Sequence, residues 1–197
     1  MKFILGKKLD MSQMFDEAGN LIPVTLILAG PCEVTQLKDE EKDGYFAVQV
    51  GFEKIEKPKK SLKTKPFKVL REFQTDEELK IGDLIDVSIF EVGDKVQVAG
   101  TTKGKGFQGG VKRYGFHGQK ATRGTKHEHR TIGSTGSRYP QRVVKGRRMP
   151  GRMGGERRTV KNLTVFKADK ENNLLVLKGA TPGNKGALLM IKEVVNL

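Results

Sequence analysis

The stretch "KVQVAGTTKGKGFQGGV" (95–111) joins two different kinds of sequence. Its first seven residues are rich in valine and follow a turn signal, which is typical of a β-strand. The octet "GKGFQGGV" (104–111) fits G-x-G-x-x-G-x-V, the pattern of the loop that covers ATP phosphates in protein kinases, and its first six residues also fit the dinucleotide-binding fingerprint. The octet therefore indicates a nucleotide site, unless glycine and lysine alternate here for another reason.

The sequence on both sides of this stretch consists of short segments rich in Val, Ile, Phe and Thr, separated by turn signals such as "EKDG" (41–44) and "KENN" (170–173). Short strands at regular spacing predict an antiparallel sandwich or barrel. Helices are expected to be short, and "TDEELKIG" (75–82) is predicted to hold one turn capped by Thr75. The predicted strands are "FILGKKL" (3–9), "LIPVTLILA" (21–29), "CEVTQLK" (32–38), "YFAVQVGFEKI" (45–55), "VLREFQ" (69–74), "DLIDVSIF" (83–90), "KVQVAGT" (95–101), "LTVFKAD" (163–169), "LLVLKG" (174–179) and "ALLMIKEVV" (187–195).

The excess positive charge is confined to one part of the chain. The net charge is +14, and residues 101–161 hold 17 Lys and Arg against two acids, whereas the other 136 residues hold 20 bases and 21 acids. A charge of this size predicts a polyanionic partner, either nucleic acid or an anionic membrane surface. The basic window lacks the Trp-, Leu- or Phe-rich amphipathic face of a membrane-surface helix, so a general membrane binder is only the third hypothesis.

The same window cannot build a core of its own. It holds 13 of the 24 glycines and only 12 hydrophobic residues, none of which recur with a helix or strand period. Such a segment is expected to be largely disordered alone and to follow an irregular polyanion closely. Its Arg and Lys residues suit phosphates, and its interleaved aromatics and histidines suit unpaired bases, as in segments that fold on structured RNA.

The nucleotide-site interpretation fails on the residues around the octet. A Rossmann fingerprint needs a helix after the glycines, but "GVKRYGFHGQKATRGT" (110–125) has no apolar stripe, so no helix is expected there. A kinase needs a catalytic loop and Asp-Phe-Gly, and a Walker A loop needs Ser or Thr where Gly106 follows Lys105. A nucleotide-binding transferase using Gly104–Gly109 remains the second hypothesis, from the enzyme class.

Other candidate sites have simpler explanations. His117, His127 and His129 lack a zinc spacing and lie among basic residues that would repel a cation, so they are expected to stack on bases or bond to phosphate. Cys32, the only cysteine, is expected to be a small packing residue. The chain has no apolar run of spanning length, and its opening residues do not fit the pattern of a signal peptide or a transit peptide, so we expect a cytosolic protein without a cofactor. The basic segment "EKPKKSLKTKPFK" (56–68) is either a second RNA-contacting loop or a solvated crossover within the barrel.

An ordered set of motifs resembles one known family. The stretches are "GTTKGKGFQGGVKRYGF" (100–116), "GSTG" (133–136), "KGRRMPGRMGGERRTV" (145–160) and "LLVLKGATPG" (174–183), together with the opening "LGKKLDMSQMFDEAGNLIPVTLI" (5–27). They resemble the family of large-subunit ribosomal protein L-three, in its shorter bacterial form. The resemblance covers essentially the whole chain.

The resemblance implies a mostly β fold: a six-stranded Greek-key β-barrel, like the second domain of translation factors, formed by residues 1–100 and 158–197. A long irregular, glycine-rich basic extension, residues 101–157, would penetrate the rRNA toward the peptidyl transferase centre. The implied function is that of a structural constituent of the large ribosomal subunit, without catalysis. It would bind the large-subunit (23S-type) rRNA near its 3′ end, support early assembly, and lie beside ribosomal proteins L-fourteen and L-nineteen.

The tip of the extension would be Ser137–Val144, and it departs from the family's pattern. Many bacterial members carry a methylated Gln in a Q-T-P-G context there, whereas this chain reads "GSRYPQRV" (136–143), is one residue shorter, and aligns Arg138 with that Gln. Gln141 follows the proline and does not match, so the methylation is not carried over. The predicted RNA-binding residues are Lys103, Lys105, Lys112, Arg113, Tyr114, His117, Arg123, Lys126, His127, His129, Arg130, Arg138, Arg142, Lys145, Arg147, Arg148, Arg152, Arg157 and Arg158.

Overall fold

The computed structural model of the chain describes residues 1–75, 79–122 and 124–194. It divides into two compact units. The first unit is Met1–Thr102 with Arg157–Leu197, and the second, which we call the loop unit, is Lys103–Glu156. Most of the chain's regular structure is strand, as the sequence predicts, and it lies in the first unit.

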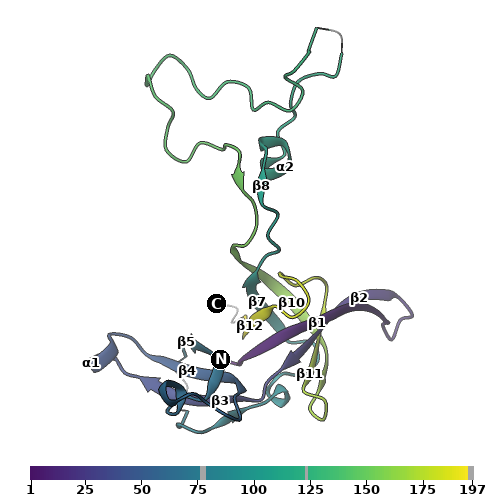
Figure 1. Cartoon of the computed structure of the whole chain (residues 1–197). Coiled ribbons are helices and arrows are strands. Elements are labelled where there is room, and N and C mark those ends of the chain that lie inside the picture. The colour runs from purple at the N-terminus through teal and green to yellow at the C-terminus, as the bar shows by residue number, and fades with distance from the viewer. Residues whose placement is uncertain (76–78, 123, 195–197) are drawn as a thin grey trace. The chain divides into compact units, whose positions relative to one another are not determined.

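Six strands of the first unit pair in the order β1-β12-β7-β10-β11-β2, and β2 pairs again with β1, so the hydrogen-bonded order runs full circle (Figure 1). All six pairings are antiparallel. The ring therefore joins the first strand of the chain to the last one. The strands are β1 (Phe3–Phe15), β2 (Leu21–Ala29), β7 (Lys95–Thr101), β10 (Arg157–Asp169), β11 (Leu174–Lys178) and β12 (Leu188–Glu193).

A second antiparallel sheet has the order β5-β4-β3-β6. It contains β3 (Cys32–Lys38), β4 (Ala47–Lys54), β5 (Phe67–Phe73) and β6 (Leu84–Ile85). The sequence predicted most of these strands but not that they leave the ring and pair among themselves. The basic segment 56–68 connects β4 to β5 and contains a 3-10 turn, η1 (Lys60–Leu62), so it is not a crossover within the ring.

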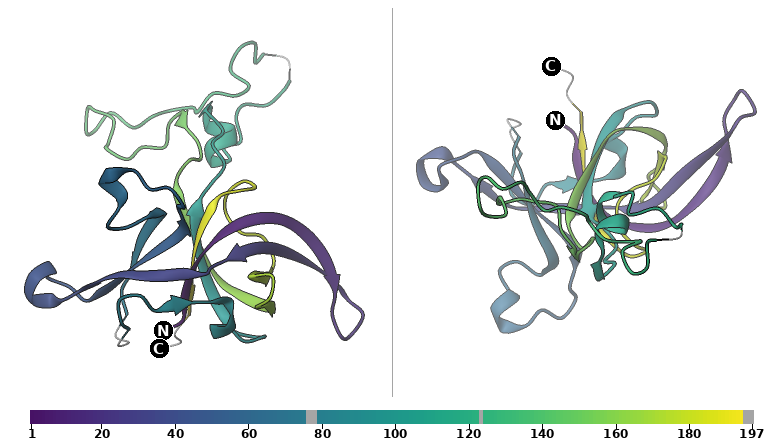
Figure 2. Two further views of the ribbon diagram at one scale, coloured as in Figure 1. Left: turned by 60° about the horizontal axis from the view of Figure 1, so that its bottom comes forward. Right: turned by 90° about the horizontal axis from the view of Figure 1, so that it is seen from above.

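The two sheets share one core. Its largest cluster combines Ile4, Ile191 and Leu189 of the ring with Val34 and Val50 of the second sheet, all at most 1% exposed. Phe3 of β1 stacks on Phe73 of β5 with ring centroids 4.6 Å apart. Cys32 is fully buried at the start of β3, which confirms its predicted packing role. Away from this core, β1 and β2 run on side by side to their connecting turn (Figure 2).

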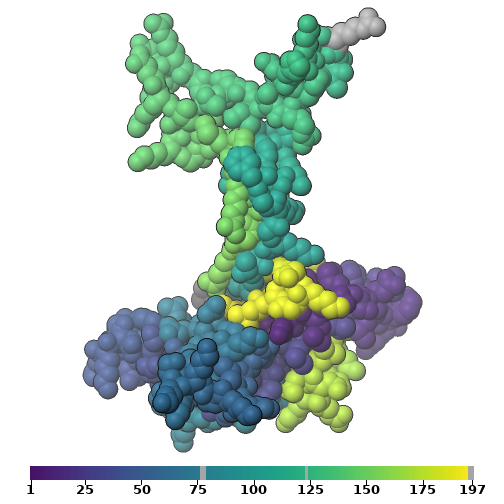
Figure 3. Space-filling view, viewed as in Figure 1, coloured from purple at the N-terminus to yellow at the C-terminus, as the bar shows by residue number. Residues whose placement is uncertain are grey.

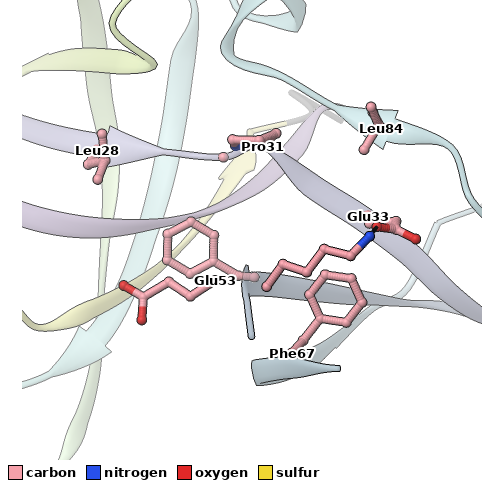
Figure 4. Close-up of a pocket in the computed structure, with 9 residues that line it drawn as sticks. Leu28, Pro31, Glu33, Glu53, Phe67 and Leu84 are labelled. Carbon is pink, nitrogen blue, oxygen red and sulfur yellow. Dashed lines mark hydrogen bonds and ion pairs between the residues drawn. The ribbon is translucent and has the colours of Figure 1, made fainter. Parts of the chain in front are cut away.

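An apolar hollow of about 290 Å³ lies on the first unit between the end of β2 and the second sheet (Figure 4). The ring of Phe67 covers Gly51 so closely that a Cβ there would overlap it. The Nζ of Lys54 lies 3.0 Å from a carboxylate oxygen of Glu33, and Glu53 reaches the same rim. Each of the two glutamates at this rim is paired with a lysine, so the hollow presents ion pairs rather than a row of cations.

The loop unit has little regular structure. Its elements are β8 (Phe107–Gln108), α2 (Gly110–Tyr114) and β9 (Gly151–Arg152), with β8 and β9 paired. The lack of an apolar stripe predicted no helix after the glycines, and α2 corrects that prediction. Gly115, with φ of 74° and its N–H bonded to the carbonyl of Val111, ends the helix after one turn, which needs no apolar stripe.

Two other segments differ from the sequence-based expectation. Residues 83–90 were predicted as one strand, but the structure has only β6 followed by a 3-10 turn, η2 (Val87–Ile89). The turn signal at 41–44 belongs to a one-turn helix, α1 (Glu40–Asp43), which ends at Gly44 in the left-handed conformation. The helical turn predicted from "TDEELKIG" falls on residues 76–78, which lie outside the described residues.

Candidate nucleic-acid interface

The loop unit presents its positive charge on the surface. Residues 103–156 hold 14 Lys and Arg against two acids, Glu128 and Glu156. Among the described residues of this unit only Gly110 is buried, and the space-filling view shows thin spans of chain rather than a packed body (Figure 3). Phe107 and Tyr139 are 77% and 70% exposed. The unit therefore offers cations and aromatic faces on a surface with almost no core beneath it.

The two limbs of the loop unit are held together near their start and end. Beside the β8–β9 pair, the N–H of Lys105 donates to the carbonyl of Met153 at 2.9 Å, and the N–H of Met153 donates to the carbonyl of Gly106 at 2.9 Å. Gly154 has φ of 73°, and a Cβ on it would overlap the carbonyl oxygen of Lys103. The close approach of the two limbs thus explains Gly154 without any nucleotide.

The octet that suggested a phosphate loop is occupied by these contacts. Gly106 has φ of 66°, and its carbonyl is bonded to the opposite limb, as is the N–H of Lys105. A phosphate-binding loop keeps successive N–H groups directed at the ligand, ahead of a full helix. The five-residue α2 provides no such helix.

Arg113 connects α2 to the returning limb. Its Nη1 donates to the carbonyl of Met149 at 2.7 Å, and Gly151 lies against the same nitrogen. The guanidinium carbon of Arg113 lies 4.9 Å from the ring centroid of Tyr114, and that of Arg148 lies 5.7 Å from it. Two distant parts of the basic sequence therefore meet on one aromatic ring, a cation–π arrangement.

A hollow of about 430 Å³ opens beside Tyr114. We call it the stacking hollow, and its lining residues are Tyr114, Gly115, Phe116, His117, Gly118, Gln119, Thr131, Ile132, Gly133 and Arg148. The rings of Tyr114 and Phe116 are 6.0 Å apart at an interplanar angle of 32°. The lining contains no carboxylate.

The region of the predicted tip is open and basic, with apolar side chains among the charges. Val143 and Val144 are 47% and 57% exposed, and Arg138 and Arg142 are also exposed. One contact closes the base of this region: Nη2 of Arg147 donates to the carbonyl of Ser134 at 2.9 Å. Exposed apolar groups rimmed by polar ones are typical of surfaces that a partner covers.

The first unit differs because six of its lysines lie within 4.0 Å of a carboxylate oxygen: Lys2, Lys7, Lys38, Lys54, Lys68 and Lys185. Lys7 and Lys68 both bond to Glu53 and hold the pKa of that carboxyl below its usual range. The bond from Lys2 does the same to the pKa of Asp94. Burial raises the pKa of the Cys32 thiol to about 11, so the thiol is neutral at physiological pH and unsuited to nucleophilic catalysis.

The described residues form neither a metal-ligand cluster nor a helix that could span a membrane. Within residues 1–75, 79–122 and 124–194, no three His, Cys, Asp or Glu side chains gather as a metal site would need. In the same ranges no helix has the length and apolar character to cross a membrane.

Comparison with known proteins gives the family. The model described as "Ribosomal protein L3" matches residues 71–174. The "Large ribosomal subunit protein uL3" of Carboxydothermus hydrogenoformans is 50% identical over 205 residues, covering 98% of this chain and 98% of that protein. Proteins of the same name from Prochlorococcus marinus and Pseudothermotoga lettingae are 52% and 46% identical, covering 96% and 98% of this chain and 92% and 97% of their own length. The chain belongs to the ribosomal protein L3 family. This is a family of structural proteins, so the chain is not an enzyme, and the transferase hypothesis for Gly104–Gly109 is wrong.

In this member of the L3 family, the predicted RNA-binding residues fall into three groups. Arg157 and Arg158 begin β10 and belong to the first unit. Arg123 lies outside the described residues. All the others lie in the loop unit, where Arg113 and Tyr114 are half-buried and the rest are exposed: Lys103, Lys105, Lys112, His117, Lys126, His127, His129, Arg130, Arg138, Arg142, Lys145, Arg147, Arg148 and Arg152.

The sequence singled out Tyr114, His117 and Arg148 but not the other residues that line the stacking hollow. Gln119, Thr131 and Ile132 carry no charge and belong to no motif, so composition alone does not single them out. The only available signal was the set of glycines around Phe116, which indicates close backbone approach without naming the partner.

Proposed function

We propose that this L3-family protein is a structural constituent of the large ribosomal subunit that binds large-subunit rRNA through its loop unit. The observation that carries the proposal is the separation of charge: 14 bases against two acids on an exposed unit, and 23 bases against 21 acids in the rest of the chain. Each phosphate neutralised by Lys or Arg releases condensed counterions, so a surface of this kind binds RNA strongly at moderate salt. The proposed location is the cytoplasmic ribosome.

The two units suit different roles, one as a folded domain and the other as an RNA-binding segment. We propose that residues 1–100 and 158–197 form the Greek-key barrel domain, like the second domain of translation factors, and that residues 101–157 are the rRNA-penetrating loop. The circular pairing order of six antiparallel strands supports the barrel. Almost none of the described residues between 103 and 156 are buried, which supports a segment that packs on RNA rather than on itself.

The finer role is inferred from the family. We propose that the protein binds near the 3′ end of the 23S-type rRNA, supports early assembly, and directs its tip, Ser137–Val144, toward the peptidyl transferase centre. Its neighbours would be ribosomal proteins L-fourteen and L-nineteen. With Arg138 where relatives carry a modified Gln, the tip would contact its surroundings through a guanidinium, which favours phosphate or base stacking.

A filter-binding titration against large-subunit rRNA fragments tests the proposal. The full chain should bind with a steep dependence on salt, and deletion of residues 103–156 should remove most of that dependence. The protein should also stay with purified large subunits through a high-salt wash. Salt-insensitive binding, or undiminished binding by the deletion variant, would contradict the proposal.

The membrane hypothesis makes a different prediction from the same charge. A general polyanion binder should sediment with anionic vesicles about as strongly as it binds rRNA, because it would recognise only the negative charge that both partners carry. The loop unit instead combines cations with aromatic rings and an open hollow, which suits bases as well as phosphates. Vesicle co-sedimentation in competition with an rRNA fragment separates the two.

A further inference from the structure

Specific close contacts between side chains and backbone define the stacking hollow. Its floor forms where Phe116 and Ile132 close over Gly110, the one buried residue among those described in the unit. A Cβ on Gly110 would lie 2.6 Å from Cγ2 of Ile132 and 2.9 Å from Cδ2 of Phe116. Both distances are shorter than carbon atoms tolerate, so only glycine permits this floor.

The wall of the hollow depends on a second close approach. Gly118 has φ of 73°, and a Cβ on it would overlap the carbonyl oxygen of His129. The N–H of Gln119 donates to the same carbonyl at 3.1 Å. These contacts bring residues 116–119 beside residue 129, and Gln119 and Thr131 both line the hollow.

The opposite side is provided by the returning limb. The bond from Arg113 to the carbonyl of Met149 fixes the chain next to Arg148, whose guanidinium then lines the hollow beside the ring of Tyr114. Tyr114, Phe116 and Arg148 thus line the hollow, and they carry the aromatic and guanidinium groups on which unpaired RNA bases stack. Its volume of about 430 Å³ falls within the range of small-ligand sites.

The polar groups of the hollow narrow the choice of occupant. The side chains of His117, Gln119 and Thr131 carry donors and acceptors, which suit the edge of a base, and Arg148 supplies the positive charge that suits the adjoining phosphate. The hollow on the first unit, in contrast, has glutamates at its rim and no such set. A planar, uncharged ring with a polar edge, attached to a phosphate backbone, fits all of these features.

We propose that the stacking hollow binds a single unpaired nucleobase of the rRNA, splayed out of its helix. This proposal rests on the proposed function, because it names what one part of the rRNA-binding surface holds. The base lies among Tyr114, Phe116 and Arg148, and its edge faces Gln119 and Thr131. The loop unit thereby reads one position of RNA structure in addition to neutralising phosphates.

The test compares Tyr114→Leu with Tyr139→Leu in assembled large subunits. Each change removes one tyrosine ring of the loop unit, but Tyr139 is 70% exposed and does not line the hollow. Subunits are purified through a high-salt wash from cells in which the variant replaces the native copy, and every rRNA base is probed with base-specific chemical reagents. Stacking on an aromatic ring stabilises a bound base by about 1–3 kcal/mol. Loss of the Tyr114 ring should therefore raise the chemical reactivity of one nucleotide roughly 5- to 150-fold in Tyr114→Leu. Tyr139→Leu should leave that nucleotide protected.

Three results would overturn the inference. If both variants are retained in subunits and Tyr114→Leu exposes no nucleotide, the nucleobase site is wrong while the rRNA-binding function stands. If both variants expose the same nucleotide, the loop stacks on RNA through its aromatic content and not through the hollow. If the wild-type chain itself is absent from washed subunits, the proposed function fails, and the nucleobase site fails with it.

Discussion

The clearest quantitative expectation concerns the salt dependence of rRNA binding. Replacing Arg138, Arg142 and Lys145 by Gln removes three exposed cations from the tip region, where no carboxylate lies in the sequence between 129 and 155. Each phosphate contact contributes about 0.7–0.9 to the slope of log K against log salt concentration, so the triple variant should lower the slope by about 2–3. If the wild type and the triple variant bind equally at about 1 M salt, the variant should bind roughly 100- to 500-fold more weakly than the wild type at about 0.1 M.

The control changes the net charge equally in the first unit. Lys54, Lys68 and Lys185 are 65%, 63% and 73% exposed, and each lies next to a carboxylate of Glu33, Glu53 or Asp10. Replacing these three by Gln should leave the slope unchanged, because they are already neutralised within the protein. Filter binding of both full-length variants to one rRNA fragment, from about 0.05 to 0.5 M salt, makes the comparison. Equal slopes for both variants would refute the reasoning, since binding would then follow net charge and not the loop unit.

Three further predictions concern the stability of the protein. Gly51→Ala should lower the free energy of unfolding by about 1–3 kcal/mol, because the new Cβ meets the Phe67 ring, whereas Gly104→Ala, with no neighbouring atom within 4 Å, should change it by less than about 0.5 kcal/mol; thermal unfolding checks both. The pKa of the Cys32 thiol, about 11, lies above its ordinary 9.0, because burial disfavours the thiolate. The free energy of unfolding should therefore be unaffected by this group below pH 9.0 and should fall by about 2–3 kcal/mol as the pH rises toward 11. In urea unfolding, Cys32→Ala should lose less stability than the wild type over this pH range. The pKa of Glu53 lies below its ordinary 4.5, so the stability that its ionised carboxylate contributes is present above pH 4.5 and is lost as the pH falls through the lowered pKa. The urea midpoint of the wild type should therefore drop more steeply with acid than that of Glu53→Gln. Parallel curves for the two proteins would contradict the assignment.

Local sequence predicted the strands better than their partners. The segments 21–29, 32–38 and 95–101 were expected as strands and coincide with β2, β3 and β7, because turn signals bound each of them. The pairing of β1 with β12 joins residues 3–7 to 188–192, a separation that no local pattern encodes. For the same reason the sequence did not reveal that β3, β4, β5 and β6 form a sheet of their own.

Composition was least reliable at the end of the basic window. Residues 157–161 lie in the basic window that was expected to lack regular structure alone, yet they form the first part of β10. The register explains this, since Arg157 and Arg158 pair with Thr101 and Gly100 of β7, so the partner strand determines their conformation rather than their own side chains. The cations of the loop unit were recognised from the sequence, but the stacking hollow was not. The hollow depends on two contacts between distant parts of the chain, that of Gly118 with His129 and that of Arg113 with Met149.

The separation of charge between the two units has a physical reason. A lysine that must bind rRNA gains little if a carboxylate of its own chain already neutralises it, so the carboxylates have to stay where the fold uses them. In the first unit Glu53 and Asp94 hold Lys7, Lys68 and Lys2. The loop unit has only two acids for its 14 Lys and Arg residues, so most of these cations have no carboxylate of their own unit to pair with. Lacking both a core and internal counterions, this unit gains from RNA the two contributions that a folded domain usually supplies itself, which is why glycine and lysine alternate in "GKGFQGGV" without forming a nucleotide site.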